Sequence, residues 1–330
     1  MGKDGVNATQ ITLPFLHDVK TNWTLSDLDI TAPNDKSNFN LTVMALILAA
    51  NIEVTVGSHA WSQVESTLDR IGFTDMRHRF FEITERINHP AMVFARSKEK
   101  VQGKTVVAAI FRGSSSYVDF ISDAKSQLDQ IRDHEAFGGF YNAGVNSTNE
   151  LKAYLNSQGL KKEETILFIT GHSYGAVVAS LVGIMSTELA ERDSIFDYSF
   201  ATPNYNRVGM TGEGMKMFSF NSNEDVVPQV PIGPHMDKTG VSIWYDRKDM
   251  QLNDPERYAR FCRLYSYFRG GNDYDADQDF MPPTYSFKAA QRKPVNSVIV
   301  RNHMPYTYMA FILSELPDEE AYAYLAEENK

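Results

Sequence analysis

The sequence predicts an α/β fold, in which a central and mostly parallel sheet is flanked by helices. Short apolar runs of buried-strand type occur at residues 105–111, 166–170, 195–201 and 217–221. Helical periodicity fills residues 139–156, followed by a stop at Gly159, and also residues 176–189. No internal repeat or linker-like stretch divides the 330 residues. We therefore expect a single domain, residues 1–330, with decorations.

The region before these strands is expected to open with two packed helices, at residues 38–52 and 61–71, because apolar residues recur there at helical spacing. Residues 1–75 are thus interpreted as an N-terminal helical segment. Strands are expected at residues 79–87, 91–95 and 105–111. The pair Gln102-Gly103 suits a hairpin turn between the last two strands.

Composition and charge are those of a globular protein that folds unaided, with 42% hydrophobic and 22% charged residues. The formal net charge of −10, with no basic block, makes nucleic acid an unexpected partner. The apolar run at residues 41–52 is too short to cross a bilayer, so no transmembrane segment is expected. The single Cys262 and the lack of a secretory signal favour a cytoplasmic location. Secretion is the alternative if a leader has been removed.

A Gly-x-Ser-x-Gly pattern, Gly171-His172-Ser173-Tyr174-Gly175, stands between an expected strand and an expected helix. A serine hydroxyl is a poor nucleophile unless a base can take its proton, and a sharp strand-to-helix turn exposes it for that purpose. The flanking glycines leave room for the turn, and the helix aims its first N–H groups at developing negative charge. We therefore predict that Ser173 is a nucleophile. The alternative is an accidental glycine-rich turn.

Four segments together resemble the class 3 lipase family, of the fungal triacylglycerol lipase type. They are Phe111-Arg112-Gly113-Ser114, the Gly-x-Ser-x-Gly segment, the stretch 221–228 and His303-Met304-Pro305-Tyr306. The resemblance covers roughly residues 90 to 310. It implies an α/β-hydrolase fold with a lid segment and a helical insert before the catalytic histidine. It also implies a carboxylic ester hydrolase that works through an acyl-enzyme and needs no cofactor or metal.

The residues Ser173, Asp225 and His303 follow the chain order in which α/β-hydrolases place nucleophile, acid and base. In that scheme His303 takes the serine proton and later gives it to the leaving alcohol, while Asp225 fixes the imidazole tautomer. Glu224 is the immediate alternative to Asp225. The other seven histidines are expected to be structural, and His172 is expected to point away across the turn.

Two donors are expected to stabilise the oxyanion of an acyl-transfer intermediate. One is the backbone N–H of Tyr174, directly after the nucleophile. The resemblance supplies Ser114 as the other, through its N–H with or without its hydroxyl. The alternative for Ser114 is a plain turn serine. Arg112 is expected to be a structural ion-pair partner and not a catalytic group.

Two segments are expected to surround this site. Apolar residues share one helical face across residues 115–131, which suggests a lid that opens through transient contact with a lipid surface. A fixed core helix is the alternative.

Residues 233–300 are interpreted as an insert or cap, with a helix from Asp254-Pro255 to about residue 267. The aspartates between Asp273 and Asp279 alternate, but Gln278 excludes an EF-hand. A solvated acidic loop is expected there, with an irregular calcium site as the alternative.

The expected substrate is an ester or lipid, and the leading hypothesis is a lipase or esterase that acts on acylglycerol-type esters. A phospholipase or thioesterase with the same triad is the first alternative, because the shape of the pocket and not the triad determines the substrate. A catalytically silent scaffold with a hydrolase fold is the second. An intact serine, acid and histidine in the expected order argues against the silent scaffold.

Overall fold

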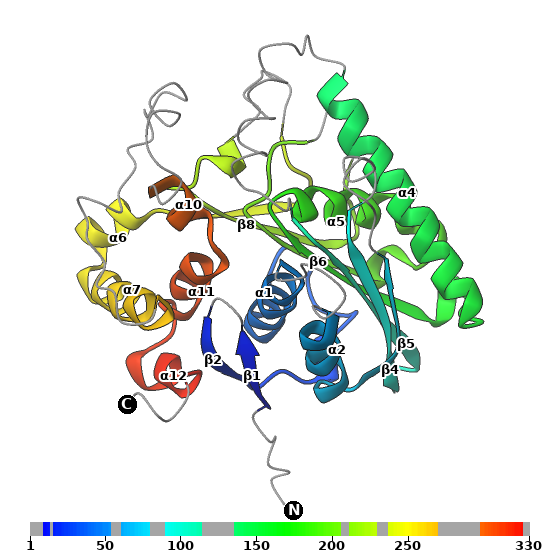
Figure 1. Cartoon of the computed structure of the whole chain (residues 1–330), viewed down its shortest axis with the longest axis horizontal. Helices are drawn as coiled ribbons and strands as arrows, with labels where there is room; N and C mark the ends of the chain where they lie inside the picture. Colours follow the sequence, from blue (N-terminus) through cyan, green and yellow to red (C-terminus); the bar gives the residue numbers. More distant parts are fainter. Residues whose placement is uncertain are drawn as a thin grey trace, which may run out of the picture.

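The computed structural model describes residues 9–13, 16–53, 61–79, 90–113, 135–205, 211–229, 237–269 and 298–325. Within these ranges one seven-stranded sheet has helices on both faces, which confirms the predicted fold class (Figure 1). Its strands, in spatial order, are β3 (Phe73–Arg79), β4 (Met92–Val101), β5 (Lys104–Phe111), β6 (Thr165–His172), β7 (Ile195–Phe200), β8 (Lys216–Ser222) and β9 (Val241–Tyr245). The strands from β5 to β9 are parallel, whereas β3 and β4 run antiparallel to their neighbours.

The hairpin predicted between β4 and β5 is present, with Val101 opposite Lys104. Its two turn residues, Gln102 and Gly103, have φ angles of 48° and 79°. Positive φ at both central residues is the turn geometry that matches the twist of a hairpin. Strand β3 shares only Arg79 with the strand expected at residues 79–87, and residues 80–87 lie outside the described part of the chain.

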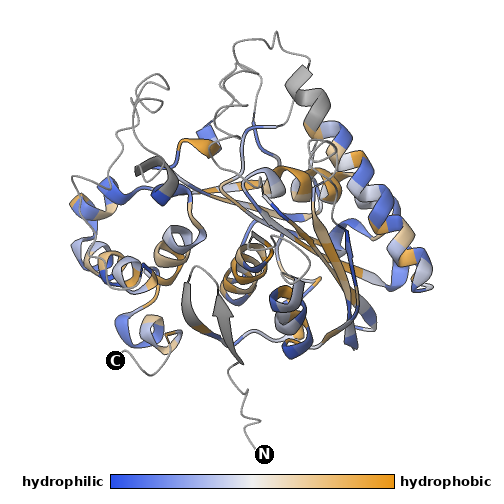
Figure 2. Ribbon diagram, viewed as in Figure 1, coloured by the Kyte–Doolittle hydropathy of each residue, from blue (hydrophilic) through white to orange (hydrophobic). Residues whose placement is uncertain are grey.

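The sheet separates two apolar layers. One face packs against α1 (Phe39–Glu53), α2 (Trp61–Arg70), α7 (Pro255–Phe268) and α11 (Pro305–Leu313). The other face packs against α4 (Glu135–Ser157) and α5 (Tyr174–Met185). Strand β5 supplies both layers in alternation, since Ala108 belongs to the first and its neighbour Ala109 to the second. Figure 2 shows the central strands, α1 and α5 as largely hydrophobic, which fits burial from both sides.

The N-terminal segment contains both predicted helices, α1 and α2, but it begins with a hairpin that the sequence did not predict. Strands β1 (Thr9–Leu13) and β2 (Leu16–Thr21) pair antiparallel. Within β2, the backbone N–H of Lys20 donates to the carbonyl of Tyr324 at 2.7 Å. Tyr324 directly follows α12 (Asp318–Ala323), so this bond joins the two ends of the described chain.

Strand β9 belongs to the main sheet, so the segment 233–300 contributes a strand before its helices. Helices α6 (Arg247–Asn253) and α7 follow, and the predicted helix from Asp254-Pro255 is confirmed by α7. The Asp254 side chain caps α7 by accepting from the Arg257 N–H at 3.0 Å. The expected lid at residues 115–131 and the aspartates at residues 273–279 lie outside the described ranges.

The remaining described helix is α10 (Val298–His303), which leads into α11. Short 3₁₀ turns occupy Leu25–Asp27, Lys162–Glu164, Ser186–Glu188, Arg192–Ser194 and Val227–Gln229. Among the helices that the structure describes, none combines the length and apolar character needed to cross a membrane.

Asp197 is a buried carboxyl on β7, in the layer next to α5. Its two oxygens accept hydrogen bonds from Ser180 Oγ at 2.7 Å and Ser199 Oγ at 2.5 Å. Burial raises the pKa of Asp197 from 3.8 to about 7, and the two serine hydrogen bonds only partly offset this rise. The folded protein therefore holds a proton here that the unfolded chain releases near pH 4.

Replacing Asp197 by asparagine is expected to raise the free energy of unfolding at pH 8 but to change it little at pH 4. The folded pKa lies above the unfolded one, so wild-type stability is lost as pH rises from about 4 to about 7. At about 1.4 kcal/mol per tenfold change, ionising this carboxyl costs the folded state up to about 4 kcal/mol. Urea unfolding at both pH values measures the difference, with the exposed Glu163→Gln as control. An Asp197→Asn effect of the same size at both pH values would contradict the assignment.

Candidate active site

Ser173 stands at the turn between β6 and α5, as the sequence predicts. Its backbone has φ 59° and ψ −127°, a conformation that side-chain-bearing residues rarely adopt. The Ser173 N–H donates to the Phe200 carbonyl at 2.9 Å, and its own carbonyl accepts from the Ala176 N–H at 3.0 Å. The side chain is buried, and its Oγ has no hydrogen-bond partner within the described part of the chain. The strained backbone thus presents a serine hydroxyl that structural hydrogen bonds do not occupy.

The two glycines of the motif are required by close backbone approaches. A Cβ added at Gly171 would lie 2.3 Å from the Gly175 carbonyl oxygen. A Cβ added at Gly175 would lie 2.3 Å from the Phe111 carbonyl oxygen. Both distances are far shorter than van der Waals contact, so neither position can hold a side chain without moving backbone. Gly175 therefore lets the start of α5 lie directly against the end of β5.

This contact brings together the two segments from which the oxyanion donors were predicted. Tyr174 is the first residue of α5, so its backbone N–H belongs to the group that has no carbonyl partner inside the helix. Its side chain is directed at α4, with its ring 5.8 Å from the Phe140 ring. Arg112 follows β5 and is buried. Ser114 lies just outside the described residues.

Asp225 and His303 are in contact in the fold. The Nδ1 of His303 donates to Asp225 Oδ2 at 2.7 Å, and both side chains are buried. Asp225 lies in the turn after β8, where its other oxygen accepts from the Val227 N–H at 2.9 Å. Because a carboxylate can only accept, the proton of a neutral His303 ring sits on Nδ1, and Nε2 is the nitrogen able to take a further proton. That is the tautomer a general base needs.

Glu224, the alternative acid, is directed elsewhere. Its carboxylate accepts from Ser222 Oγ at 2.9 Å and from the Arg247 N–H at 3.1 Å, and it lies 3.9 Å from the Arg247 guanidinium Nε. Burial raises the pKa of Glu224, while Arg247 opposes that rise. The geometry therefore selects Asp225 over its neighbour as the partner of His303.

Tyr308 is a member of this cluster that the sequence did not identify. It lies on α11, and its buried hydroxyl donates to Asp225 Oδ2 at 2.7 Å, the same oxygen that accepts from His303. Burial and the neighbouring Asp225 raise the pKa of Tyr308 well above 10, so the phenol stays protonated and remains a donor. Nothing local in the sequence indicates which residue of α11 faces Asp225.

Replacing Tyr308 by phenylalanine is expected to lower kcat by about threefold to tenfold. Loss of the phenol removes one of the hydrogen bonds that hold Asp225 Oδ2 beside Nδ1 of His303, so the imidazole is held less firmly. Kinetics on a soluble ester measure the loss, with circular dichroism as the check on folding. An unchanged kcat in a folded Tyr308→Phe variant would argue against this role.

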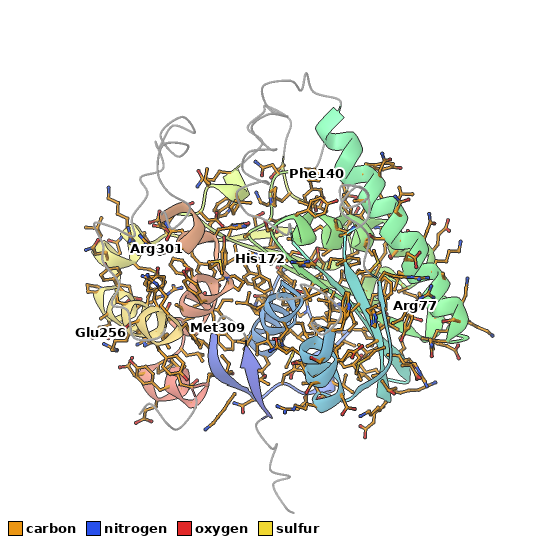
Figure 3. All side chains as sticks on the ribbon, viewed as in Figure 1. Arg77, Phe140, His172, Glu256, Arg301 and Met309 are labelled. Carbon is orange, nitrogen blue, oxygen red and sulfur yellow. The ribbon has the colours of Figure 1, made fainter. Side chains whose placement is uncertain are left out.

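His172 was expected to be structural and to point away across the turn, and the structure places its ring beside that of His303. The two ring centroids are 4.7 Å apart, and His172 Nε2 is 2.8 Å from the His303 carbonyl oxygen. Figure 3 places His172 at the centre of the molecule. Since His172 immediately precedes Ser173, this contact brings the strained turn next to the Asp225–His303 pair.

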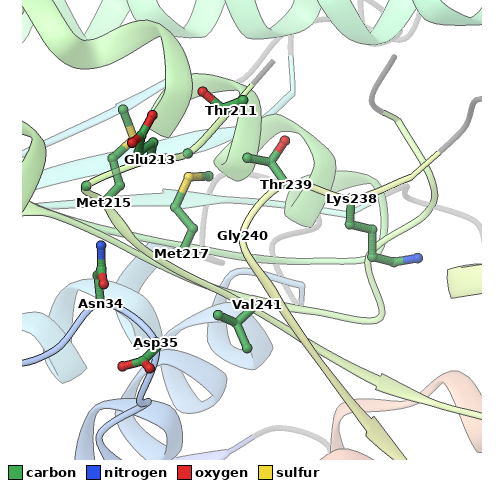
Figure 4. Close-up of a pocket in the computed structure, with 12 residues that line it drawn as sticks. Asn34, Asp35, Thr211, Glu213, Met215, Met217, Lys238, Thr239, Gly240 and Val241 are labelled. Carbon is green, nitrogen blue, oxygen red and sulfur yellow. The ribbon is translucent and has the colours of Figure 1, made fainter. Parts of the chain in front are cut away.

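A cavity of about 410 Å³ lies beside the starts of β8 and β9, whereas Asp225 follows the far end of β8 (Figure 4). Its lining includes Asn34, Asp35, Thr211, Glu213, Met217 and Thr239. None of Ser173, Asp225 and His303 lines it. The cavity is therefore separate from the candidate active site.

The family model described as lipase (class 3) matches residues 108–234, which include Ser173 and Asp225. None of the curated proteins matches the chain. Among solved structures, a triacylglycerol lipase whose catalytic centre is described as a serine protease triad is 18% identical, with a TM-score of 0.45, over 63% of this chain and 81% of its own. A triacylglyceride lipase from Rhizomucor miehei is 16% identical, with a TM-score of 0.42, over 61% and 79%. A lipase from Yarrowia lipolytica is 16% identical, also with a TM-score of 0.42, over 62% and 78%.

Proposed function

Because the chain is a class 3 lipase relative over residues 108–234, we propose that it hydrolyses carboxylic esters of the acylglycerol type through an acyl-enzyme on Ser173. One observation carries the proposal. Ser173, at a strained strand-to-helix turn, directly follows His172, whose ring centroid lies 4.7 Å from that of His303, and His303 is joined to the buried Asp225 by a 2.7 Å hydrogen bond. This is the arrangement that nucleophilic attack on an ester carbonyl requires.

The reaction proceeds in two halves. In the first, His303 Nε2 takes the proton of Ser173 Oγ as Oγ attacks the carbonyl carbon, and then gives that proton to the departing alcohol oxygen. The acyl group is left bonded to Oγ. In the second half, a water molecule gives a proton to His303 and attacks the acyl carbon, and Ser173 Oγ recovers the proton as the carboxylic acid leaves. Asp225 accepts the Nδ1–H throughout and stabilises each imidazolium.

The oxyanion of each tetrahedral intermediate is assigned to two donors, the backbone N–H of Tyr174 and Ser114. The start of α5 supports the first assignment, since Tyr174 directly follows the nucleophile. The close approach of Gly175 to the Phe111 carbonyl supports the second, because it draws the chain that leads to Ser114 toward the nucleophile.

Residues 115–131 are assigned as a lid that opens at a lipid surface. The full burial of Ser173 supports a moving cover, since an ester cannot reach a buried hydroxyl without displacement of some segment. The single apolar face of this stretch suits contact with lipid once it is displaced. Hydrolysis of tributyrin across its solubility limit tests the lid. A jump in rate is expected at the limit, and a smooth saturation curve through it contradicts a lipid-activated lid.

The substrate class is tested with a panel of p-nitrophenyl esters from short to long acyl chains, with triolein, phosphatidylcholine and an acyl thioester beside them. Acylglycerol hydrolysis is expected to exceed hydrolysis of the other two lipid classes. A preference for phosphatidylcholine or for the thioester would favour the phospholipase or thioesterase alternative. Each assay is run on wild type and on Ser173→Ala. If wild type releases product no faster than Ser173→Ala on every substrate, only the silent scaffold remains.

A further inference from the structure

His172 has no role in the reaction as described, although it is buried in contact with the proposed base. The alternation of β6 explains its position. Phe168 and His172 point to the face covered by α1 and α11, whereas Ile169 and Gly171 face α5. His303 and Tyr308 approach that same face from α10 and α11. The residue before the nucleophile is therefore directed at the segment that carries the base.

The contact between them fixes the proton on His172. Its Nε2 is 2.8 Å from the backbone carbonyl oxygen of His303. A carbonyl oxygen can only accept, so Nε2 carries the proton and donates it. Burial and the nearby His303 lower the pKa of His172 well below 6.5, so the ring is neutral at the pH values at which a serine hydrolase works. His172 thus adds a hydrogen-bond donor and no second positive charge beside the base.

We propose that His172 is a positioning residue for the base: its Nε2–H holds the backbone carbonyl of His303 and so fixes the imidazole relative to Ser173. The inference rests on the proposed function. Ser173 is adjacent to His172 in the chain, while His303 is 131 residues away from His172. The Asp225 and Tyr308 hydrogen bonds position His303 relative to the turn after β8. The His172 bond connects it to the strand that leads to the nucleophile.

A structural core histidine would be the simpler interpretation, and it predicts different behaviour. Such a residue would affect stability, and any replacement of similar volume would serve equally well. A positioning residue affects kcat at unchanged stability, and only a replacement with a donor in the Nε2 position restores it. Misplacement of a reacting group by about 1 Å can cost about a hundredfold in rate.

The test compares His172→Gln with His172→Met. The Gln amide nitrogen stands three bonds beyond Cβ, as Nε2 of histidine does, whereas Met has nearly the same length and no donor. His172→Gln is expected to keep kcat within about threefold of wild type, and His172→Met to lower it by about tenfold to a hundredfold, with KM within about twofold in both. Equal kcat values for the two variants at matched melting temperatures would overturn the proposal.

A second measurement on the wild-type protein needs neither variant activity nor an ester. Nitrogen-15 spectra of histidine-labelled protein are expected to contain one imidazole that is protonated at Nε2, unprotonated at Nδ1, and does not titrate near pH 6.5. Its hydrogen bond to a carbonyl should be visible as slow exchange of the Nε2 proton. The Nδ1–H tautomer at His172, or its titration near pH 6.5, would overturn the inference. Failure of the proposed function would appear separately, as a wild type that hydrolyses no ester.

Discussion

Replacing Ser173 by alanine is expected to lower kcat for ester hydrolysis by on the order of 10⁵-fold to 10⁶-fold, to the rate given by binding and oxyanion donors alone. The variant lacks the atom that bonds to the acyl group, and neither Asp225 nor His303 can replace it. Substrate binding should change little, because the missing hydroxyl makes its main contribution in the transition state. Single-turnover release of p-nitrophenol measures the loss, with circular dichroism as the check on folding. A Ser173→Ala variant that keeps more than about a hundredth of wild-type activity would require another nucleophile.

Glycine at the same position separates the chemistry from the backbone strain. Ser173→Gly is expected to be as inactive as Ser173→Ala, but its free energy of unfolding should be about 1 kcal/mol higher than that of the alanine variant. At φ 59° and ψ −127°, alanine keeps the steric penalty of a Cβ and glycine does not. The gain is partly offset by the larger entropy of an unfolded glycine. Urea denaturation of both variants measures the difference, and a glycine variant less stable than the alanine variant would exclude strain at this turn.

Replacing Asp225 by asparagine is expected to lower kcat by about 10⁴-fold, whereas Glu224→Gln should leave kcat within about threefold of wild type. Asparagine keeps the size of Asp225 but cannot stabilise the imidazolium, and its amide N–H₂ can turn toward His303 and impose the wrong tautomer. The carboxylate of Glu224 accepts hydrogen bonds from Ser222 and the Arg247 N–H instead. Kinetics on one soluble ester at pH 8 compare the two variants directly.

The two neighbouring acids also differ in their expected effect on stability. Glu224→Gln leaves the buried guanidinium of Arg247 without its carboxylate, which costs on the order of 3 kcal/mol when a buried pair is broken. Thermal unfolding should therefore move to lower temperature for Glu224→Gln although its kcat is retained. Loss of activity in both variants with equal loss of stability would mean that the acid had not been identified.

Much of the fold followed from the sequence because its signals are local. The buried strands are continuous apolar runs, the β4–β5 turn has glycine where positive φ is needed, and Asp254-Pro255 begins a helix in the usual way. Strand β9 was missed for the converse reason. It is the edge strand of the sheet, its residues alternate between half-buried and exposed, and Trp244 is 41% exposed. Such a strand has no buried run to detect.

The candidate site could be predicted only as far as chain order and motif spacing allow. Order and spacing indicated Ser173, Asp225 and His303, but Glu224 differs from Asp225 by a single position and has the same charge. Only the fold separates the two acids, because they leave the turn after β8 in different directions. Tyr308 and His172 depend on packing between distant segments, for which the sequence gives no local signal.

His303 depends on segments that are distant in the chain from the turn at Ser173. It ends α10, and α11, which follows it, packs against α1. The hydrogen bond from Lys20 to the carbonyl of Tyr324 ties β2 to the residue after α12. A molecule in which α10 and α11 have not docked therefore carries a serine without its base, so the proposed hydrolysis requires these helices to be in place.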